Sequence, residues 1–511
     1  MRFAVCFILA TATVVNAMGG DPGRSQSLTL IECINRGLKN NYDVRIEQLN
    51  AVIAQYNLTG ANGAYEPVFN FRAGEQLLTV PGGIDPKKSG LDSPYELTTD
   101  SVGMGISGIL PTGLQYGIQA TSSRLRELTD FSTVPGAFFL YPPAGIRSTN
   151  QFTSAAAITL QQPLLRDFWI DRYRQIISVN QKNLKMSEMG LRWRMMNLVY
   201  SIQRNYHELA YLQGKVRVDE QGVNLVGQLL NGTRRQVEVG KAPSIDIQQV
   251  ESQFESAKAT LVSSQQILSR QRNGLRSLIS SDYRTQTDAV LEAEEESTPV
   301  PSVSDRTESW RAALEKRPDL SELRLDLEKQ GIVVRFQFNQ LFPTLNLVGG
   351  YGLQSQENST EASLADIRDQ SKPQYGFGVV LSIPLSGNQA ARNTYRAGKA
   401  AKEQLVLRLK KLEQEVLVQV EDSLNQVQST YHRAEATRRS RQYAEVALKG
   451  EQQKLADGVS TAFFVLQSQQ KLSEAQTAEI RAQADYWIAV AQLEFNEGRT
   501  LEKHGIRVRL N

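Results

Sequence analysis

The sequence predicts an α+β membrane protein with two internal repeats, each combining a few short strands with very long antiparallel helices. Three observations lead to this class. One segment occurs twice without a gap: Asp43 and Asp319 are 276 residues apart, and so are Pro67 and Pro343. Hydrophobic residues follow coiled-coil spacing over long stretches without proline. Runs of about ten residues alternate small or polar with hydrophobic side chains, as strands with two different faces do.

The repeats set the expected domain boundaries. Two later turns, Val239-Gly240 and Asp457-Gly458, are only 218 residues apart, so the first copy holds extra residues between its strands and its long helices. Two repeats of this length predict one pseudo-symmetric body rather than two unrelated domains. We expect the first repeat over 18–280, the second over 305–500, an acidic, proline-containing linker over 281–304, and a C-terminal tail over 501–511.

The N-terminus predicts export. Arg2 precedes a hydrophobic run over 3–15, and Val15-Asn16-Ala17 supplies small or tolerated residues for cleavage after Ala17, so residues 1–17 are expected to be a signal peptide. A buried first strand or helix is the alternative. No later segment has eighteen uninterrupted hydrophobic residues, which excludes a helical membrane anchor in the mature chain. The mature protein is then either soluble in the exported compartment or inserted as a β-barrel.

The long helices follow from heptad spacing. Between Leu164 and about Gly232 there is no proline, and Met195, Ile202 and Leu209 begin a strict seven-residue series. A helix of about 65 residues is on the order of 100 Å long. The second repeat has a similar stripe over 405–431, and returning helices are expected over 243–280 and 460–497. A stack of shorter helices, interrupted at three glycines, is the alternative: Gly190, Gly214 and Gly222.

Six segments are expected to be strands: 67–79, 101–110, 114–122, 151–162, 343–354 and 374–385. An ordinary half-buried sheet would alternate in the same way. Pro111-Thr112-Gly113 predicts a tight turn, whereas 80–100, 123–150 and 355–373 read as long loops. The hairpin over 101–122 could join a barrel, extend above it, or replace a shorter loop. About four strands per chain cannot close a water-filled barrel, so closure requires a cyclic oligomer.

Composition argues against several other functions. The net charge of +3 and the lack of a basic stripe give no case for nucleic acid. Without the signal peptide, Cys33 is the only cysteine, and the three histidines, His207, His432 and His504, are far apart. No zinc spacing, nucleophile elbow or phosphate-binding loop is present. We therefore expect neither an enzyme nor a bound cofactor or metal.

Several short segments recur in a fixed order. Asn40 to Asp43 follow the first helix, and prolines mark the expected strand–helix junctions at Pro67, Pro163, Pro343 and Pro384. Proline fixes such a junction because it lacks a backbone donor and disfavours helix in the preceding residue. In their order, spacing and duplication these segments resemble the TolC-like outer-membrane efflux proteins along nearly the whole mature chain.

The resemblance implies an architecture and a function. It implies a homotrimer with a 12-stranded β-barrel in the outer-membrane lipid, about four strands per protomer, continuous with a long coiled-coil tunnel in the periplasm. It also implies an exit duct that docks to a periplasmic adaptor and an inner-membrane transporter, in a tripartite efflux or type I secretion system. A soluble periplasmic coiled-coil scaffold or adaptor is the alternative function. The sequence does not encode the cargo.

The resemblance also suggests site residues at the two helical turns. Adaptor-docking positions would be Val239, Gly240, Gly458 and Val459, and pore-gate candidates would be Asp246, Gln249, Phe463, Phe464 and Gln467. Asp246 matches an acidic latch position. Phe464 and Gln467 stand where relatives often have aspartate, and Ser460 replaces a latch arginine. Phe464 therefore either forms a hydrophobic constriction or simply packs between helices, and Asp246 could be an ordinary acid in a first helical turn.

Overall fold

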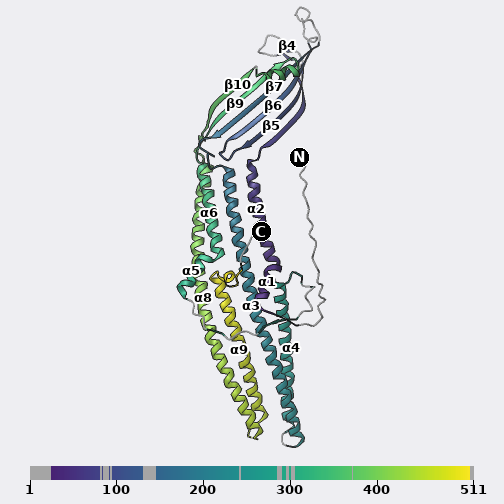
Figure 1. Ribbon diagram of the computed structural model, residues 1–511, viewed down its shortest axis with the longest axis vertical. Coiled ribbons are helices and arrows are strands. Elements are labelled where there is room, and N and C mark those ends of the chain that lie inside the picture. Colours follow the sequence, from purple (N-terminus) through teal and green to yellow (C-terminus); the bar gives the residue numbers. More distant parts are fainter. Residues whose placement is uncertain are drawn as a thin grey trace, which may run out of the picture. The chain divides into compact units, whose positions relative to one another are not determined.

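The computed structural model divides the chain into two compact units (Figure 1). Unit 1 holds the described parts of 1–49, 189–321 and 411–511, and unit 2 those of 50–188 and 322–410. Four helices contribute residues to both units: α2 (Tyr42–Asn62), α3 (Arg172–Glu238), α6 (Pro318–Asn339) and α8 (Gln389–Ala456). The structure describes residues 25–80, 83–84, 91–92, 95–130, 146–240, 243–282, 284, 290–294, 299–300, 305–370, 372–457 and 459–506.

Some of the sequence-based expectations lie outside the described residues. These are the signal peptide over 1–17, Gly458, residues 507–511 of the C-terminal tail, and most of the linker over 281–304. Within the described ranges, no helix is both long enough and hydrophobic enough to cross a membrane.

Unit 2 contains a six-stranded antiparallel sheet with the order β10-β9-β7-β6-β5-β2. Its strands are β2 (Val68–Val80), β5 (Tyr95–Ile109), β6 (Gln115–Asp130), β7 (Ile146–Pro163), β9 (Thr344–Glu357) and β10 (Pro373–Ser382). The expectation of about four strands per chain is therefore wrong, because the hairpin whose position the sequence left open belongs to the sheet. A separate short pair, β3 (Gly83–Ile84) and β4 (Leu91–Asp92), precedes β5.

The expected long loops are shorter than predicted. β5 begins at Tyr95, inside the loop expected over 80–100, and β6 and β7 extend into the one expected over 123–150. The segment expected as a loop over 355–373 contains helix α7 (Thr360–Arg368). Ser359 caps this helix, because its hydroxyl accepts from the Ala362 backbone N–H at 3.2 Å.

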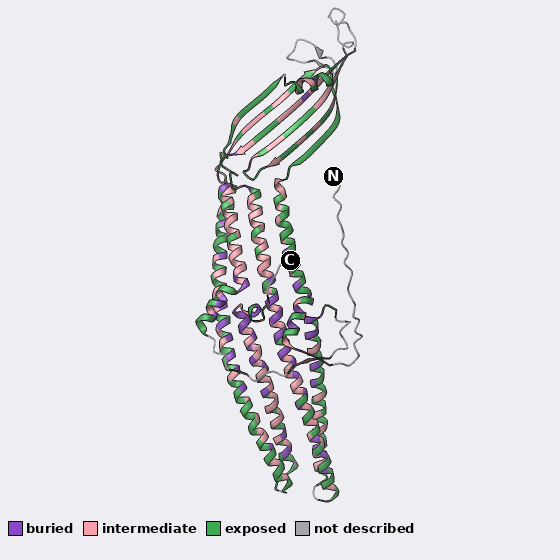
Figure 2. Cartoon of the chain, in the orientation of Figure 1, coloured by how far each residue is buried: buried purple, intermediate pink, exposed green. Residues whose placement is uncertain are grey.

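Unit 1 is a set of packed helices with one main hydrophobic core (Figure 2). Its remaining elements are α1 (Leu30–Asn40), α4 (Ile245–Ile279), α5 (Arg306–Lys316), α9 (Ala462–Asn496), α10 (Thr500–Lys503) and the parallel strand pair β1 (Ser25–Leu28) and β8 (Val290–Ala293). Heptad positions Ile202 and Leu209 are at most 1% exposed. Helix α3 is continuous over 67 residues, so the alternative of shorter helices is wrong.

Paired lengths and local caps define the helices. Helices α3 and α8 have 67 and 68 residues, and α4 and α9 have 35 each. Thr29 and Glu32 form a reciprocal capping box that starts α1. The segment expected to be an exposed linker contributes β8, where Leu291 is only 5% exposed. The Tyr206 hydroxyl, which donates to the Leu28 carbonyl at 3.1 Å, joins α3 to this strand pair.

Candidate functional site

One face of the sheet in unit 2 carries hydrophobic side chains in rows that cross every strand. The strand registers align one such row as Phe69, Ile106, Ile118, Ile158, Tyr351 and Tyr375. These side chains are open in the single chain: Tyr375 is 79% exposed, and its neighbour on the same face, Phe377, is 86% exposed. Packing within one chain therefore does not explain this face.

The opposite face of the same sheet is small and polar. The row next to the hydrophobic one consists of Asn70, Gly105, Gln119, Ala157, Gly352 and Gln374. Further along the strands the hydrophobic rows give way to charge, where Asp100 lies opposite Arg124. The sheet thus has a bounded hydrophobic band on one face and a polar wall on the other.

The junction after β7 is held by residues at the end of α6. Asp167 and Trp169 have positive φ angles of 64° and 57°, so the chain turns sharply here. The Asn339 side chain accepts from the Asp167 backbone N–H at 2.7 Å, and the Gln340 amide donates to the Asp167 carboxylate at 2.6 Å. Asp171 then caps α3 by accepting from the Arg174 N–H at 2.9 Å. Helix α3 therefore begins at Arg172, eight residues after Leu164, where the proline-free stretch of the sequence starts.

The four junction prolines lie at the ends of the long strands near the tight turn. Pro67 and Pro343 immediately precede β2 and β9, Pro163 is the last residue of β7, and Pro384 follows β10 by two residues. The turn between β5 and β6 lies at this same end, because the Gln162 amide donates to the Thr112 carbonyl at 3.2 Å.

In unit 1, three of the gate candidates line one cavity. The cavity has a volume of about 590 Å³ and lies between α3, α4 and α9. Its lining includes Val226, Gln249, Gln253, Phe463, Gln467 and Gln469. Gln469 is buried, and its amide donates to the Gly222 carbonyl at 3.2 Å. Glutamine is the most frequent residue in this lining, which also contains the carboxylates of Asp219 and Glu474. The lining therefore offers amide hydrogen-bond donors and acceptors beside two acidic groups.

The other two gate candidates, Phe464 and Asp246, do not line this cavity. The Phe464 ring, half-exposed, contacts the Phe463 ring edge-on with a centroid separation of 5.5 Å. Asp246 is in the first turn of α4 and is partly exposed. Leu466 of α9 packs on the small core of Val226, Leu230 and Val250, which joins α9 to the hairpin of α3 and α4.

The two helical turns expose small hydrophobic residues. Val239 follows α3 and is 67% exposed, and Gly240 adopts a φ of +70°, which glycine tolerates without strain. In the second turn Val459 is 78% exposed. The Ser460 hydroxyl donates to Glu451 at 2.5 Å, and with Lys454 it holds the pKa of the Glu451 carboxyl below its usual range. Ser460 thus contacts its own hairpin.

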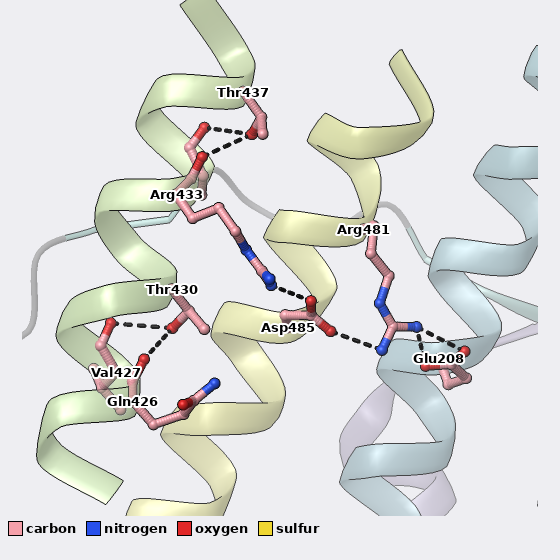
Figure 3. Close-up of polar contacts among 9 residues, drawn as sticks. Glu208, Gln426, Val427, Thr430, Arg433, Thr437, Arg481 and Asp485 are labelled. Atoms are coloured by element: carbon pink, nitrogen blue, oxygen red, sulfur yellow. Dashed lines mark hydrogen bonds and ion pairs between the residues drawn. The ribbon is translucent and has the colours of Figure 1, made fainter. Parts of the chain in front are cut away.

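An ion-pair network joins three helices farther along unit 1 (Figure 3). Arg481 of α9 donates to both carboxylate oxygens of Glu208 on α3, at 2.9 and 2.8 Å, and also pairs with Asp485 at 2.8 Å. Arg433 of α8 pairs with the other oxygen of Asp485. Burial opposes the charge on Arg481, but Glu208 and Asp485 outweigh it and raise the pKa of Arg481.

Sequence reasoning did not single out this network. The spacing of Arg481 and Asp485, four residues apart on one helix, was the available signal. Their partners Glu208 and Arg433 come from distant parts of the chain, so only the folded structure identifies them. Close helix packing accompanies the network: a Cβ on Gly214 of α3 would lie 3.0 Å from the Ile480 side chain of α9.

Comparison with known proteins identifies the family. The profile of the family described as outer membrane efflux protein matches residues 113–281 and 310–498. These ranges cover more than half of the chain, and they include β6 and all of the long helices α3, α4, α8 and α9. The chain belongs to the outer membrane efflux protein family. The resemblance drawn from the sequence is thereby confirmed, and the family places the protein in the outer membrane with a periplasmic helical portion.

Individual relatives agree with this family. The outer membrane protein TolC of Vibrio cholerae is 24% identical over 349 residues, which cover 66% of this chain and 75% of that protein. The solved outer membrane protein VceC, also from Vibrio cholerae, has a TM-score of 0.64 at 16% identity. The match covers 92% of this chain and 96% of the VceC chain. A membrane protein from Pseudomonas aeruginosa has a TM-score of 0.66 at 15% identity, with coverages of 92% and 90%.

The family is one of efflux proteins, not of enzymes. Across the ranges that the structure describes, no group of three or more His, Cys, Asp or Glu residues is placed to hold a metal ion. That the chain is not catalytic and binds no cofactor stays a prediction from the sequence.

Proposed function

We propose that this protein is the exit duct of a tripartite efflux or type I secretion system. It passively conducts substrates from an inner-membrane transporter and a periplasmic adaptor through the outer membrane. The observation that carries the proposal is the two-faced sheet. A hydrophobic face with Phe377 at 86% exposure suits lipid, and the polar face with Asn70 and Gln119 suits a water-filled lumen.

The height of the hydrophobic face supports this placement. On β9 it extends from Leu345 to Leu353, which is eight residue steps and about 27 Å along the strand, or about 21 Å in height at a strand tilt of about 40°. Outer-membrane barrels carry a hydrophobic band of about 25 Å. The charged pair of Asp100 and Arg124 lies beyond this band, where headgroups and water begin.

We infer that three copies form the duct. A sheet edge left open in lipid would leave backbone groups without partners, so the sheets of neighbouring copies must close on one another. Helix α2 supports association independently, because it exposes a stripe at coiled-coil spacing: Tyr42, Ile46, Leu49, Ile53 and Tyr56, all 55% exposed or more. The number three rests on the family resemblance. The matched lengths of α3 with α8 and of α4 with α9 support two repeats per chain.

A soluble periplasmic scaffold is the weaker candidate. Such a protein needs no strands at all, and it would leave the row from Phe69 to Tyr375 in water. Exposed hydrophobic patches much larger than a few hundred Å² are rare in soluble monomers.

Membrane fractionation and gel mobility test the proposal together. We expect the protein in the outer-membrane fraction, migrating as an oligomer in unheated detergent samples and as a 57 kDa species or slightly less after boiling. A second arm measures how much of a fluorescent efflux substrate cells retain. We expect more retention in cells without the gene, and efflux restored when the intact chain is expressed. A freely soluble monomer would contradict the proposal.

We propose that the gate lies at the α9 turn and involves Phe464, with Phe463, Gln467, Gln249 and Asp246 around it. Adaptor contacts would use Val239, Gly240, Gly458 and Val459, of which Val239 and Val459 have exposed side chains. A ring of phenylalanines would narrow the pore by hydrophobic contact and would not select ions by charge. Single-channel recordings of Phe464→Ala should show greater leakage in the closed state. The matched variant Phe463→Ala tests its neighbour, and unchanged leakage in F464A would remove Phe464 from the gate.

A further inference from the structure

The hairpin of β5 and β6 is an integral part of the sheet. β5 pairs with β2 at thirteen positions and with β6 at fifteen, and β6 pairs with β7 at sixteen. By comparison, β7 pairs with β9 at twelve positions and β9 with β10 at ten. A hairpin that extended above the sheet would not pair along its full length with both neighbours.

The hairpin also lies at the level of the hydrophobic band. Its Ile106 and Ile118 are in the same row as Phe69 and Ile158, and its Gly105 and Gln119 continue the polar row on the other face. Its turn at Pro111–Gly113 lies beside the C-terminal end of β7, where the Gln162 amide donates to the Thr112 carbonyl. The hairpin therefore has one hydrophobic and one polar face, and it lies at the level of the hydrophobic band, as a strand pair in a barrel wall would.

The two edges of the sheet are open and match each other. β2 is exposed along twelve of its thirteen residues, and β10 is exposed at all but one position. Since all five pairings are antiparallel and the strands number six, β2 and β10 run in opposite directions. The β10 edge of one copy can therefore pair with the β2 edge of the next as one more antiparallel step, with the same face outward.

From these observations we infer that copies of this chain join β10 to β2 and that the trimer closes an 18-stranded barrel, in which β5 and β6 are wall strands. This inference rests on the proposed trimeric duct. It differs from the 12-stranded barrel that the family resemblance implied. Barrel diameter grows roughly in proportion to strand number, so the outer exit is about one and a half times as wide.

The consequence is a wide outer exit. Barrels of 16 to 18 strands leave an open aqueous channel. The polar face contributed by the hairpin is built from short side chains, including Gly103, Gly105, Gly117 and Thr121, which leave the lumen clear. The barrel therefore does not limit the size of the cargo, and selection falls to the helical part.

Counting strands in the full mature protein tests the inference directly. Electron cryo-microscopy of the protein in lipid nanodiscs should show eighteen strands around a threefold axis. Twelve strands around a threefold axis would overturn the inference and leave the proposed duct intact. A monomer without a closed barrel would instead overturn the proposed function.

Disulfide trapping tests the edge contact itself. Asn70→Cys on β2 is combined in turn with Gln374→Cys, Gly376→Cys, Gly378→Cys and Val380→Cys on the same face of β10. Because barrel closure staggers the strands, one or two adjacent pairs should give covalent trimers on non-reducing gels. Asn70→Cys with Val379→Cys, which lie on opposite faces, is the matched control and should stay uncrosslinked.

A second pair of substitutions tests whether the hairpin of β5 and β6 lies inside the barrel wall or outside it. If the hairpin were outside the barrel, β2 would lie against β7, and Asn70→Cys would crosslink within the chain to Ala157→Cys. In the inferred wall these residues are separated by β5 and β6, and Asn70→Cys crosslinks instead to Gly105→Cys, its direct partner. Crosslinking of 70 to 157 would overturn the inference.

Discussion

The helices of unit 1 and the sheet of unit 2 use hydrophobic residues in opposite ways. In unit 1, Val199 and Ile202 are fully buried in a core that the chain builds for itself. In the sheet, Tyr375 and Phe377 are among the most exposed residues. Both regions have a regular hydrophobic pattern, with a period of seven in α3 and of two in the strands.

The difference shows that periodicity reports which face is hydrophobic but not what covers it. A core residue is covered by its own chain, so its substitution acts on the stability of the single chain. A hydrophobic sheet residue that its own chain does not cover needs cover from elsewhere, and in the proposed duct that cover is lipid. The four predictions below test this contrast, from the largest expected effect to the smallest.

The core of unit 1 should respond most strongly to loss of volume. Ile202→Ala is expected to lower the free energy of unfolding by about 2–5 kcal/mol, because it leaves a cavity in a tightly packed site. Chemical unfolding followed by helical circular dichroism measures this change. Ile202→Val should cost only about 0.5–1.5 kcal/mol. Equal, small effects for both would mean that unit 1 has no tight core.

The sheet should respond to charge on one face only. Ile118→Lys is expected to destabilise the membrane-inserted protein by about 2–4 kcal/mol, because it places an ammonium group in lipid. Gln119→Lys, one residue away on the polar face, should have little effect. Unfolding in lipid vesicles, followed by the heat-dependent gel shift, compares the two variants. A larger loss of stability in Gln119→Lys than in Ile118→Lys would mean that the face assigned to lipid is the wrong one.

Cys33 reports burial in unit 1 through its reactivity. Burial raises the pKa of the Cys33 thiol to about 11. Thiolate is the reactive form, so a rise of about two pKa units makes the folded protein react roughly 100-fold more slowly with a thiol reagent near pH 8. The rate should rise about tenfold for each pH unit up to that pKa. Unfolded protein is the control, and equally fast labelling of both forms would contradict the burial.

The ion-pair network should contribute least. A double-mutant cycle with Arg481→Gln and Glu208→Gln is expected to give a coupling energy of about 0.2–1 kcal/mol, because Arg481 is partly exposed and solvent screens the pair. Thermal unfolding of the four proteins measures it. Lys449→Gln with Glu445→Gln, an exposed pair within one helix, is the matched control and should couple less. No coupling between Arg481 and Glu208 would mean that the network does not join α3 to α9.

Much of the architecture was predictable because its signals are local. The heptad series through Ile202 located α3, and Pro67 and Pro343 marked the starts of two strands. The far ends of β5, β6 and β7 were missed because residues such as Thr98, Ser123 and Ser148 carry no hydrophobic alternation. Helix α7 was missed because it has nine residues and depends on a cap at Ser359.

The candidate site was less predictable for a different reason. The resemblance pointed to the helical turns, and the structure brings Gln249, Phe463 and Gln467 together at one cavity. Long-range partners are invisible in sequence: Glu208 and Arg481 are 273 residues apart. Strand order is likewise a tertiary property, which is why the sequence alone does not decide the role of the hairpin at 101–122.

The most direct test of the account is an accessibility scan across the hairpin in outer-membrane vesicles. Single cysteines at positions 116–121 of β6 would carry a spin label, and collisions with oxygen, which partitions into lipid, would be compared with those of a water-soluble nickel complex. The account predicts alternation, with oxygen favoured at 116, 118 and 120 and nickel at 117, 119 and 121. Uniform access for nickel at all six positions would contradict it, because the hydrophobic face would then lie in water.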